Sequence, residues 1–236
     1  MNNLPKTRAV TRNHFHNSEL LRLLAELRVI EAPDSAKEFA ENLGQWVGFA
    51  EAITLHGIHS AAQGHALGAQ PPWPATSSDA ATVLGDELRR VQAKLTTIIL
   101  KKSGQIEDVN HYAPCRQSHL ACQRDMEAQV RQLRAKVREI VALASPALKH
   151  LATLDAAFDA ILLEREKKLL STLPALMERR FQSLRTAHHD QQNQPPTWLP
   201  GFCHALQTVL LAELDLRLQP TLGLIEAFND QTTQNA

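Results

Sequence analysis

Hydrophobic residues recur along most of this chain at the three- and four-residue spacings of amphipathic helices. The clearest run is Leu84, Leu88, Val91, Leu95 and Ile98, with spacings of 4, 3, 4 and 3. This is the pattern of a coiled-coil seam sustained over two heptads. No segment shows the alternation of apolar and polar residues that is typical of a half-buried strand. The sequence therefore predicts an all-α fold.

Residues 79–187 are predicted to form three long helices. The second runs from about Pro114 to about Ala144, and the third is capped by Ser145. Pro174 must kink or restart the third helix, because proline lacks an N–H and clashes with the preceding turn. Since the connections are short, we expect antiparallel neighbours that form a coiled-coil-like three-helix core.

The C-terminal region is predicted to be a buried pair of helices that packs on this bundle. The first helix starts at Trp198 and stops at Pro220, and the stretch Val209–Leu218 is apolar on nearly all sides. Glu213 and Arg217 lie four residues apart and are expected to pair on its one polar strip. The predicted core positions are Leu84, Leu88, Val91, Leu95, Met126, Val130, Leu133, Val137, Phe158, Leu210, Leu214 and Leu218.

Polar and proline-rich stretches separate these helical regions. The expected parts are a flexible N-terminus (1–17), an N-terminal helical unit (18–62), a Pro/Gly-rich linker (63–78), the long-helix bundle (79–187), a polar linker (188–197), the C-terminal helices (198–228) and a tail (229–236).

The composition excludes several classes of protein. Of the 236 residues, 44% are hydrophobic and 25 basic residues balance 25 acidic ones, which argues against a globally basic nucleic-acid binder. Glycine is scarce, and the glycine-rich phosphate-binding motifs are absent. The N-terminus lacks the apolar core of a signal peptide, and no apolar run approaches the roughly 18 residues of a membrane span. We expect a cytoplasmic, soluble protein without membrane insertion.

The balanced net charge hides a local asymmetry. Residues 19–55 contain seven acidic and three basic residues. On the second long helix, five arginines lie between about +80° and +160° of Met126 on a helical wheel, and we call them the arginine stripe: Arg116, Arg124, Arg131, Arg134 and Arg138. Three interpretations stay open for the stripe, namely a solvated helix face, a docking face for an acidic protein surface, or a track for a nucleic-acid backbone.

A helix-turn-helix over residues 18–58 is a second nucleic-acid hypothesis. Its recognition helix would cover residues 46–55, which contain no Arg, Lys, Asn or Gln that could read base edges. The acidic charge of this region also repels phosphate, so the sequence argues against this motif.

The densest group of metal-ligand residue types is His111, Cys115, His119 and Cys122, at spacings of 4, 4 and 3. On a helix, the two cysteines lie roughly 10.5 Å apart along the axis, whereas ligands of one zinc ion must converge to about 2.0–2.3 Å from it. We therefore expect packed thiols and surface histidines, with no metal and no cofactor. His119 and Cys115 remain the weak metal candidates.

Several blocks of the sequence are distinctive. They are Pro33–Trp46 (PDSAKEFAENLGQW), Tyr112–Pro114 (YAP), Met126–Arg138 (MEAQVRQLRAKVR), Ser145–Leu148 (SPAL), Leu170–Glu178 (LSTLPALME) and Leu211–Ala227 (LAELDLRLQPTLGLIEA). In these blocks the chain resembles an uncharacterised proteobacterial family, domain of unknown function 3348. The resemblance covers most of residues 18–228. The blocks contain no catalytic triad, metal motif or nucleotide loop, so the resemblance transfers no functional residue.

Members of this family resemble the F component of the type III Zorya anti-phage defence system, which pairs a MotA/MotB-like proton-driven motor with two further cytoplasmic proteins. The resemblance implies a cytoplasmic partner of the motor complex or of a companion defence protein. The charge asymmetry and the long amphipathic helices favour a non-enzymatic protein that acts by protein–protein contacts through the arginine stripe and the acidic N-terminal unit. The alternative is a DNA-binding effector subunit that uses the arginine face of the 115–144 helix, and a metal-dependent hydrolase is the more remote one. Homo-oligomerisation is left open.

Overall fold

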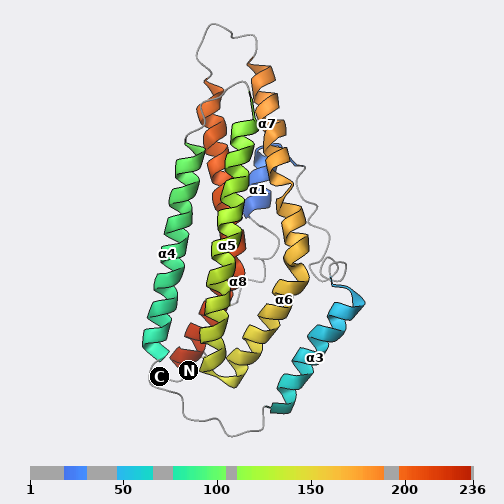
Figure 1. Cartoon of the computed structure of the whole chain (residues 1–236), viewed down its shortest axis with the longest axis vertical. Coiled ribbons are helices and arrows are strands. Elements are labelled where there is room, and N and C mark those ends of the chain that lie inside the picture. Colours follow the sequence, from blue (N-terminus) through green and yellow to red (C-terminus); the bar gives the residue numbers. More distant parts are fainter. Residues whose placement is uncertain (1–18, 31–46, 66–76, 105–110, 189–196, 235–236) are drawn as a thin grey trace, which may run out of the picture.

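The computed structural model describes residues 19–30, 47–65, 77–104, 111–188 and 197–234 (Figure 1). In these ranges the regular secondary structure is entirely α-helical, which confirms the predicted fold class. The helices are α1 (Glu19–Glu26), α3 (Phe49–His65), α4 (Ser77–Ser103), α5 (Ala113–Ala144), α6 (Pro146–Leu170), α7 (Leu173–Ala187) and α8 (Trp198–Gln234).

The long helices run up and down the molecule in the order α4, α5, α6 with α7, and α8 (Figure 1). Helix α5 packs against α4, α6 and α8, and α4 also packs against α8. Helix α8 is therefore a full member of the bundle. The core is formed by α4, α5, α6 with α7, and α8. The sequence instead predicts a core of three long helices, with a pair of C-terminal helices packed on it.

The third predicted helix begins at Ser145 and is interrupted next to Pro174, as the sequence predicts. Ser145 has an extended backbone, and its Oγ accepts a 3.2 Å hydrogen bond from the backbone N–H of Leu148. Helix α6 ends at Leu170, and α7 restarts with Pro174 in its first turn. The buried hydroxyl of Tyr112 donates a 2.8 Å hydrogen bond to the carbonyl of Pro174, which fixes the start of α5 against this restart.

Helix α8 continues through Pro220 to Gln234, so the predicted helix pair is a single helix and the expected tail from residue 229 is helical as far as Gln234. An interior proline costs roughly 3 kcal/mol. Pro220 is exposed, whereas Leu218 before it and Leu224 after it are both buried in the core. Burial of each leucine contributes about 1.5–3 kcal/mol, so packing on both sides of Pro220 outweighs its local cost.

The predicted core positions are mostly correct. Nine are buried: Leu84, Leu95, Met126, Val130, Leu133, Val137, Leu210, Leu214 and Leu218. Leu88 and Val91 are partly buried against this cluster. The prediction is wrong for Phe158, because its side chain is partly exposed and lies outside this core cluster. It belongs to α6, which packs against α5 on one side and α3 on the other.

The N-terminal helices attach to different parts of the bundle. Helix α1 packs against α8 and contributes Leu20 and Leu24 to the main core, while α3 packs against α6. The predicted N-terminal unit therefore shares the core of the bundle through α1. Its capping-box segment, residues 31–46, lies outside the described residues, as do most of the predicted linkers and the first 17 residues.

Candidate functional site: the arginine stripe and a polar groove on α5

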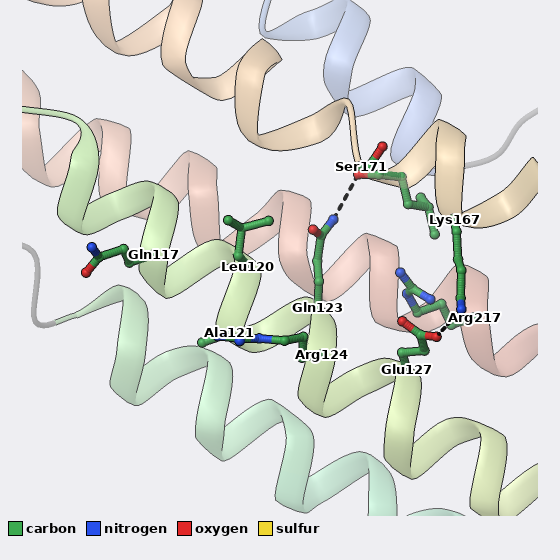
Figure 2. A pocket seen from close by; sticks show the side chains of 10 residues that line it. Gln117, Leu120, Ala121, Gln123, Arg124, Glu127, Lys167, Ser171 and Arg217 are labelled. Carbon is green, nitrogen blue, oxygen red and sulfur yellow. Dashed lines mark hydrogen bonds and ion pairs between the residues drawn. The ribbon is translucent and has the colours of Figure 1, made fainter. Parts of the chain in front are cut away.

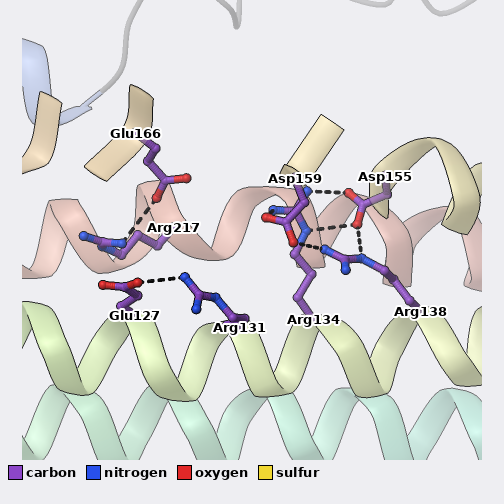
Figure 3. A network of polar contacts seen from close by, with 8 residues as sticks. All are labelled: Glu127, Arg131, Arg134, Arg138, Asp155, Asp159, Glu166 and Arg217. Atoms are coloured by element: carbon purple, nitrogen blue, oxygen red, sulfur yellow. Dashed lines mark hydrogen bonds and ion pairs between the residues drawn. The ribbon is translucent and has the colours of Figure 1, made fainter. Parts of the chain in front are cut away.

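The structure divides the arginine stripe into two halves. In the C-terminal half, Arg134 and Arg138 point from α5 toward Asp155 and Asp159 on α6 (Figure 3). Arg134 makes contacts of 2.6 and 2.9 Å with Asp155 and of 2.9 Å with Asp159. Arg138 lies 2.6 Å from Asp155 and also bonds Asp159. We call these four side chains the α5–α6 ion cluster.

The ion cluster is largely shielded from solvent. The side chains of Arg134 and Asp155 are each 12% exposed. Burial alone would lower the pKa of Arg138, but its hydrogen bonds to Asp159 and Asp155 outweigh burial and raise it. Arg134 and Arg138 therefore hold two helices together, and their charges are already matched. These two predicted binding residues serve an internal contact.

The N-terminal half of the stripe stays on the surface. Arg131 is 49% exposed and pairs with Glu127 on the same helix at 2.7 Å. Arg116 and Arg124 are exposed, and in the described part of the chain neither of them forms an ion pair. The accessible charge of the stripe is thus concentrated at Arg116 and Arg124.

A groove of about 680 Å³ opens beside Arg124. It lies between α5, the break that separates α6 from α7, and α8 (Figure 2). Lys167 lines the groove, and its Nζ lies 3.0 Å from Oε1 of Glu127. The hydrogen bond from Lys167 is the main reason that the pKa of Glu127 is lowered. The groove is lined by Gln117, Leu120, Ala121, Gln123, Arg124, Glu127, Lys167, Leu170, Ser171 and Arg217.

A buried carboxylate lies next to the groove. Glu213 is fully buried, and its Oε1 accepts hydrogen bonds of 3.0 and 2.8 Å from Arg217. The predicted pairing of Glu213 and Arg217 is confirmed, but the pair lies inside the bundle and only 9% of the Arg217 side chain is exposed. The amide of Gln123 donates to Glu213 at 3.1 and 3.2 Å and to the Leu170 carbonyl at 2.9 Å.

Sequence reasoning missed Gln123 altogether. The available signal was its position three residues before Met126, on the buried side of α5, where a glutamine needs a polar partner. Its amide links α5 both to the end of α6 and to α8. Gln123 therefore positions Glu213, and through it Arg217, beside the groove.

His119 corrects a second expectation, because it is fully buried where a surface histidine was predicted. Its Nε2 lies 3.7 Å from Glu213 Oε2, which is too long for a hydrogen bond, and neither ring nitrogen has a hydrogen-bond partner in the described part of the chain. Cys115 and Cys122 are also buried, and burial raises the pKa of Cys122 to about 11. Within the described ranges no three His, Cys, Asp or Glu side chains come together as metal ligands.

Together these features define the class as a helical-bundle protein with a polar groove and a partly exposed arginine stripe on its second long helix. The chain matches the model of the family described as "Protein of unknown function (DUF3348)" over residues 6–230, and it belongs to that family. No curated protein and no solved structure shows a significant match to the chain.

Proposed function

We propose that this protein is a non-enzymatic component of an anti-phage defence system and that it acts by binding another protein. The partner is the cytoplasmic part of a MotA/MotB-like motor or a companion defence protein. The family membership and the resemblance of its members to the F component of the type III Zorya system support the pathway. None of the helices in the described ranges has the length and hydrophobicity needed to cross a bilayer, and we place the protein in the cytoplasm as part of this proposal.

The observation that carries protein binding is a row of side chains on α5. Arg116, Leu120 and Arg124 follow one another at four-residue intervals, so they share one face of the helix. All three are exposed, and Leu120 is a large apolar side chain 38% exposed between the two arginines. Arginine together with apolar contact area is the composition that protein interfaces favour.

The ion cluster weakens the DNA-binding alternative. A duplex-binding helix needs a series of free cations, and Arg134 and Arg138 are occupied by aspartates. Arg116 and Arg124, which form no ion pair with any residue that the structure describes, span only about 12 Å along α5. A surface of this size with a leucine at its centre matches an acidic, partly apolar protein surface better than it matches a phosphate backbone.

Co-purification tests this proposal. The full chain, tagged at one end, is co-expressed with the products of its neighbouring genes, and the associated proteins are identified by mass spectrometry. We expect a stoichiometric complex with the motor's cytoplasmic part or with a companion protein. Recovery of the tagged chain free of both proteins would refute the proposal.

A gel-shift experiment with duplex and single-stranded DNA tests the alternative. Binding through phosphates would be present at about 50 mM salt and would weaken steeply at about 200 mM. We expect no shift at either concentration. A shift with this salt dependence would favour the DNA-binding function.

A further inference from the structure

Helix α3 carries two neighbouring apolar side chains that are exposed. Phe49 is 84% exposed and Ile53 is 57% exposed, and they lie one turn apart on the same face of the helix. The other large hydrophobic residues that are exposed in the described ranges have no such neighbour one turn away. A contiguous apolar face of this kind is typical of a contact surface.

The exposed face of α3 has the spacing of a helix–helix seam. Phe49, Ile53, His56 and Ser60 follow one another at intervals of 4, 3 and 4 residues, and all four are exposed. Helices that pack along one another present their contact residues at these intervals. Ser60 Oγ lies 3.4 Å from His56 Nε2, so the two polar members of the seam contact each other. The spacing indicates that the occupant of this face is another helix.

The opposite face of α3 packs only partly against the bundle. Leu55 and Ile58 are half-buried on the side that lies against α6, and the ring of His59 lies 5.9 Å from that of His150 on α6. Among residues 49–60 of α3 none is fully buried. Because helices in proteins owe most of their stability to tertiary packing, a second helix on the outer face would add burial that α6 alone does not provide.

The charge pattern of α3 narrows the choice of occupant. Glu51 is its single Asp, Glu, Lys or Arg residue, and it is half-buried on the α6 side. A helix that binds a bilayer surface carries Lys and Arg beside its apolar face, and a face that selects a charged partner protein carries the opposite charges. The outer face of α3 has neither. In a symmetric dimer the same face of both copies meets, and an uncharged face avoids repulsion between like charges.

We propose that two copies of this chain associate through the outer faces of their α3 helices. Figure 1 shows α3 at the edge of the molecule, outside α6, so its outer face points away from the bundle. In the dimer, Phe49 and Ile53 of each protomer pack against the seam of the other. The row formed by Arg116, Leu120 and Arg124 lies on a different helix, α5, so the dimer leaves it available for the proposed partner.

The size of the contact predicts a weak, reversible dimer. The 17 residues of α3 span about 25 Å, and at a width of about 10 Å one face of the helix offers roughly 250 Å². A standard stable interface buries about 800 Å² on each partner. We therefore expect a dimerisation Kd of roughly 10–100 μM. Because the seam is apolar, the Kd should change less than about twofold between about 50 and 500 mM salt.

Sedimentation velocity of the full chain at about 5, 50 and 500 μM tests the proposal. We expect the average mass to rise from that of one chain toward that of two as the concentration increases. A wild-type chain that stays monomeric at the highest concentration would overturn the proposal. If that monomer loses its partner protein when Phe49 and Ile53 are both changed to Glu, the face belongs to the partner and not to a second copy.

Variants locate the contact. Phe49→Glu with Ile53→Glu places like charges in both copies of the seam and should weaken dimerisation at least about tenfold. Leu143→Glu is the matched control, because Leu143 is 86% exposed and lies on α5, and it should dimerise as wild type does. All three positions are exposed, so circular dichroism should show unchanged helix content. If the double variant dimerises like wild type, the contact lies elsewhere and the proposal is wrong.

The dimer and the proposed function are tested separately. Arg116→Glu should weaken the complex with the partner protein and leave the dimerisation Kd within about twofold of the wild-type value, since this residue is not on α3.

Discussion

Replacing Arg134 by alanine should destabilise the protein measurably, because this side chain joins α5 to α6 inside the ion cluster. Arg134 makes a two-pronged contact with Asp155 and a third contact with Asp159. In the wild-type structure the side chains of Asp155 and Asp159 are 12% and 25% exposed, so truncating Arg134 leaves two partly buried carboxylates without their main partner. Arg138 would then be the only cation of the cluster left to balance them.

The size of the effect follows from the exposure of the cluster. Removing one partner of a fully buried ion pair costs about 3–5 kcal/mol, whereas an exposed pair contributes about 0.2–1 kcal/mol. The cluster is mostly shielded and Arg138 remains as a second cation, so we expect a loss of about 2 kcal/mol. For a chain of this length, that loss corresponds to a decrease in Tm of roughly 4–8 °C.

Urea unfolding followed by circular dichroism measures the loss, and Arg131→Ala is the control. Arg131 lies one turn earlier on α5 and pairs at an exposed site within one helix, so its loss should cost only about 0.3–0.5 kcal/mol. A double-mutant cycle with Asp155→Ala should give a coupling energy of about 1–2 kcal/mol. If Arg134→Ala costs no more than Arg131→Ala, Arg134 is solvated and the division of the stripe is wrong.

Three further results are expected. Native protein treated with iodoacetamide should be alkylated first at the partly exposed Cys203, and Cys122 should react only on unfolding because it is buried with a pKa near 11; peptide mass spectrometry that shows both labelled together would contradict the packing. The hydrogen bond from Lys167 lowers the pKa of Glu127 below its usual value of 4.5. The contribution of ionised Glu127 to stability is therefore complete above pH 4.5 and is lost as the pH falls through the lowered folded-state pKa. Between about pH 5 and 3, the Tm of Glu127→Gln should fall less than that of wild type. Ser145→Ala should cost about 1 kcal/mol in urea unfolding and Ser145→Asp should restore most of it, since either side chain can cap α6 and alanine cannot.

The helices themselves could be predicted because their signals are local. Apolar spacing, the Ser145 cap and the restart at Pro174 each depend on residues within a few positions of one another. The end predicted at Pro220 was wrong because its outcome depends on tertiary contacts, with buried side chains on both sides keeping α8 continuous. For the same reason, the sequence alone did not show α8 as the fourth member of the core.

The candidate site was only partly predictable. A helical wheel places all five arginines on one side of α5, but it does not show that Asp155 and Asp159 of α6 face two of them. It likewise identifies the spacing of Glu213 and Arg217 without revealing that the pair is buried. Contacts between helices decide which charges are matched internally and which remain for a partner.

The affinity of the purified partner for charge-reversed protein tests the central claim most directly. The variant is Arg116→Glu with Arg124→Glu, and the matched control reverses two exposed cations on α4, Arg89→Glu with Lys94→Glu. If the exposed half of the arginine stripe binds the partner, the first variant should bind at least about tenfold more weakly than wild type, and the control should bind within about twofold of it. Equal affinity of the Arg116/Arg124 variant and wild type would contradict the account.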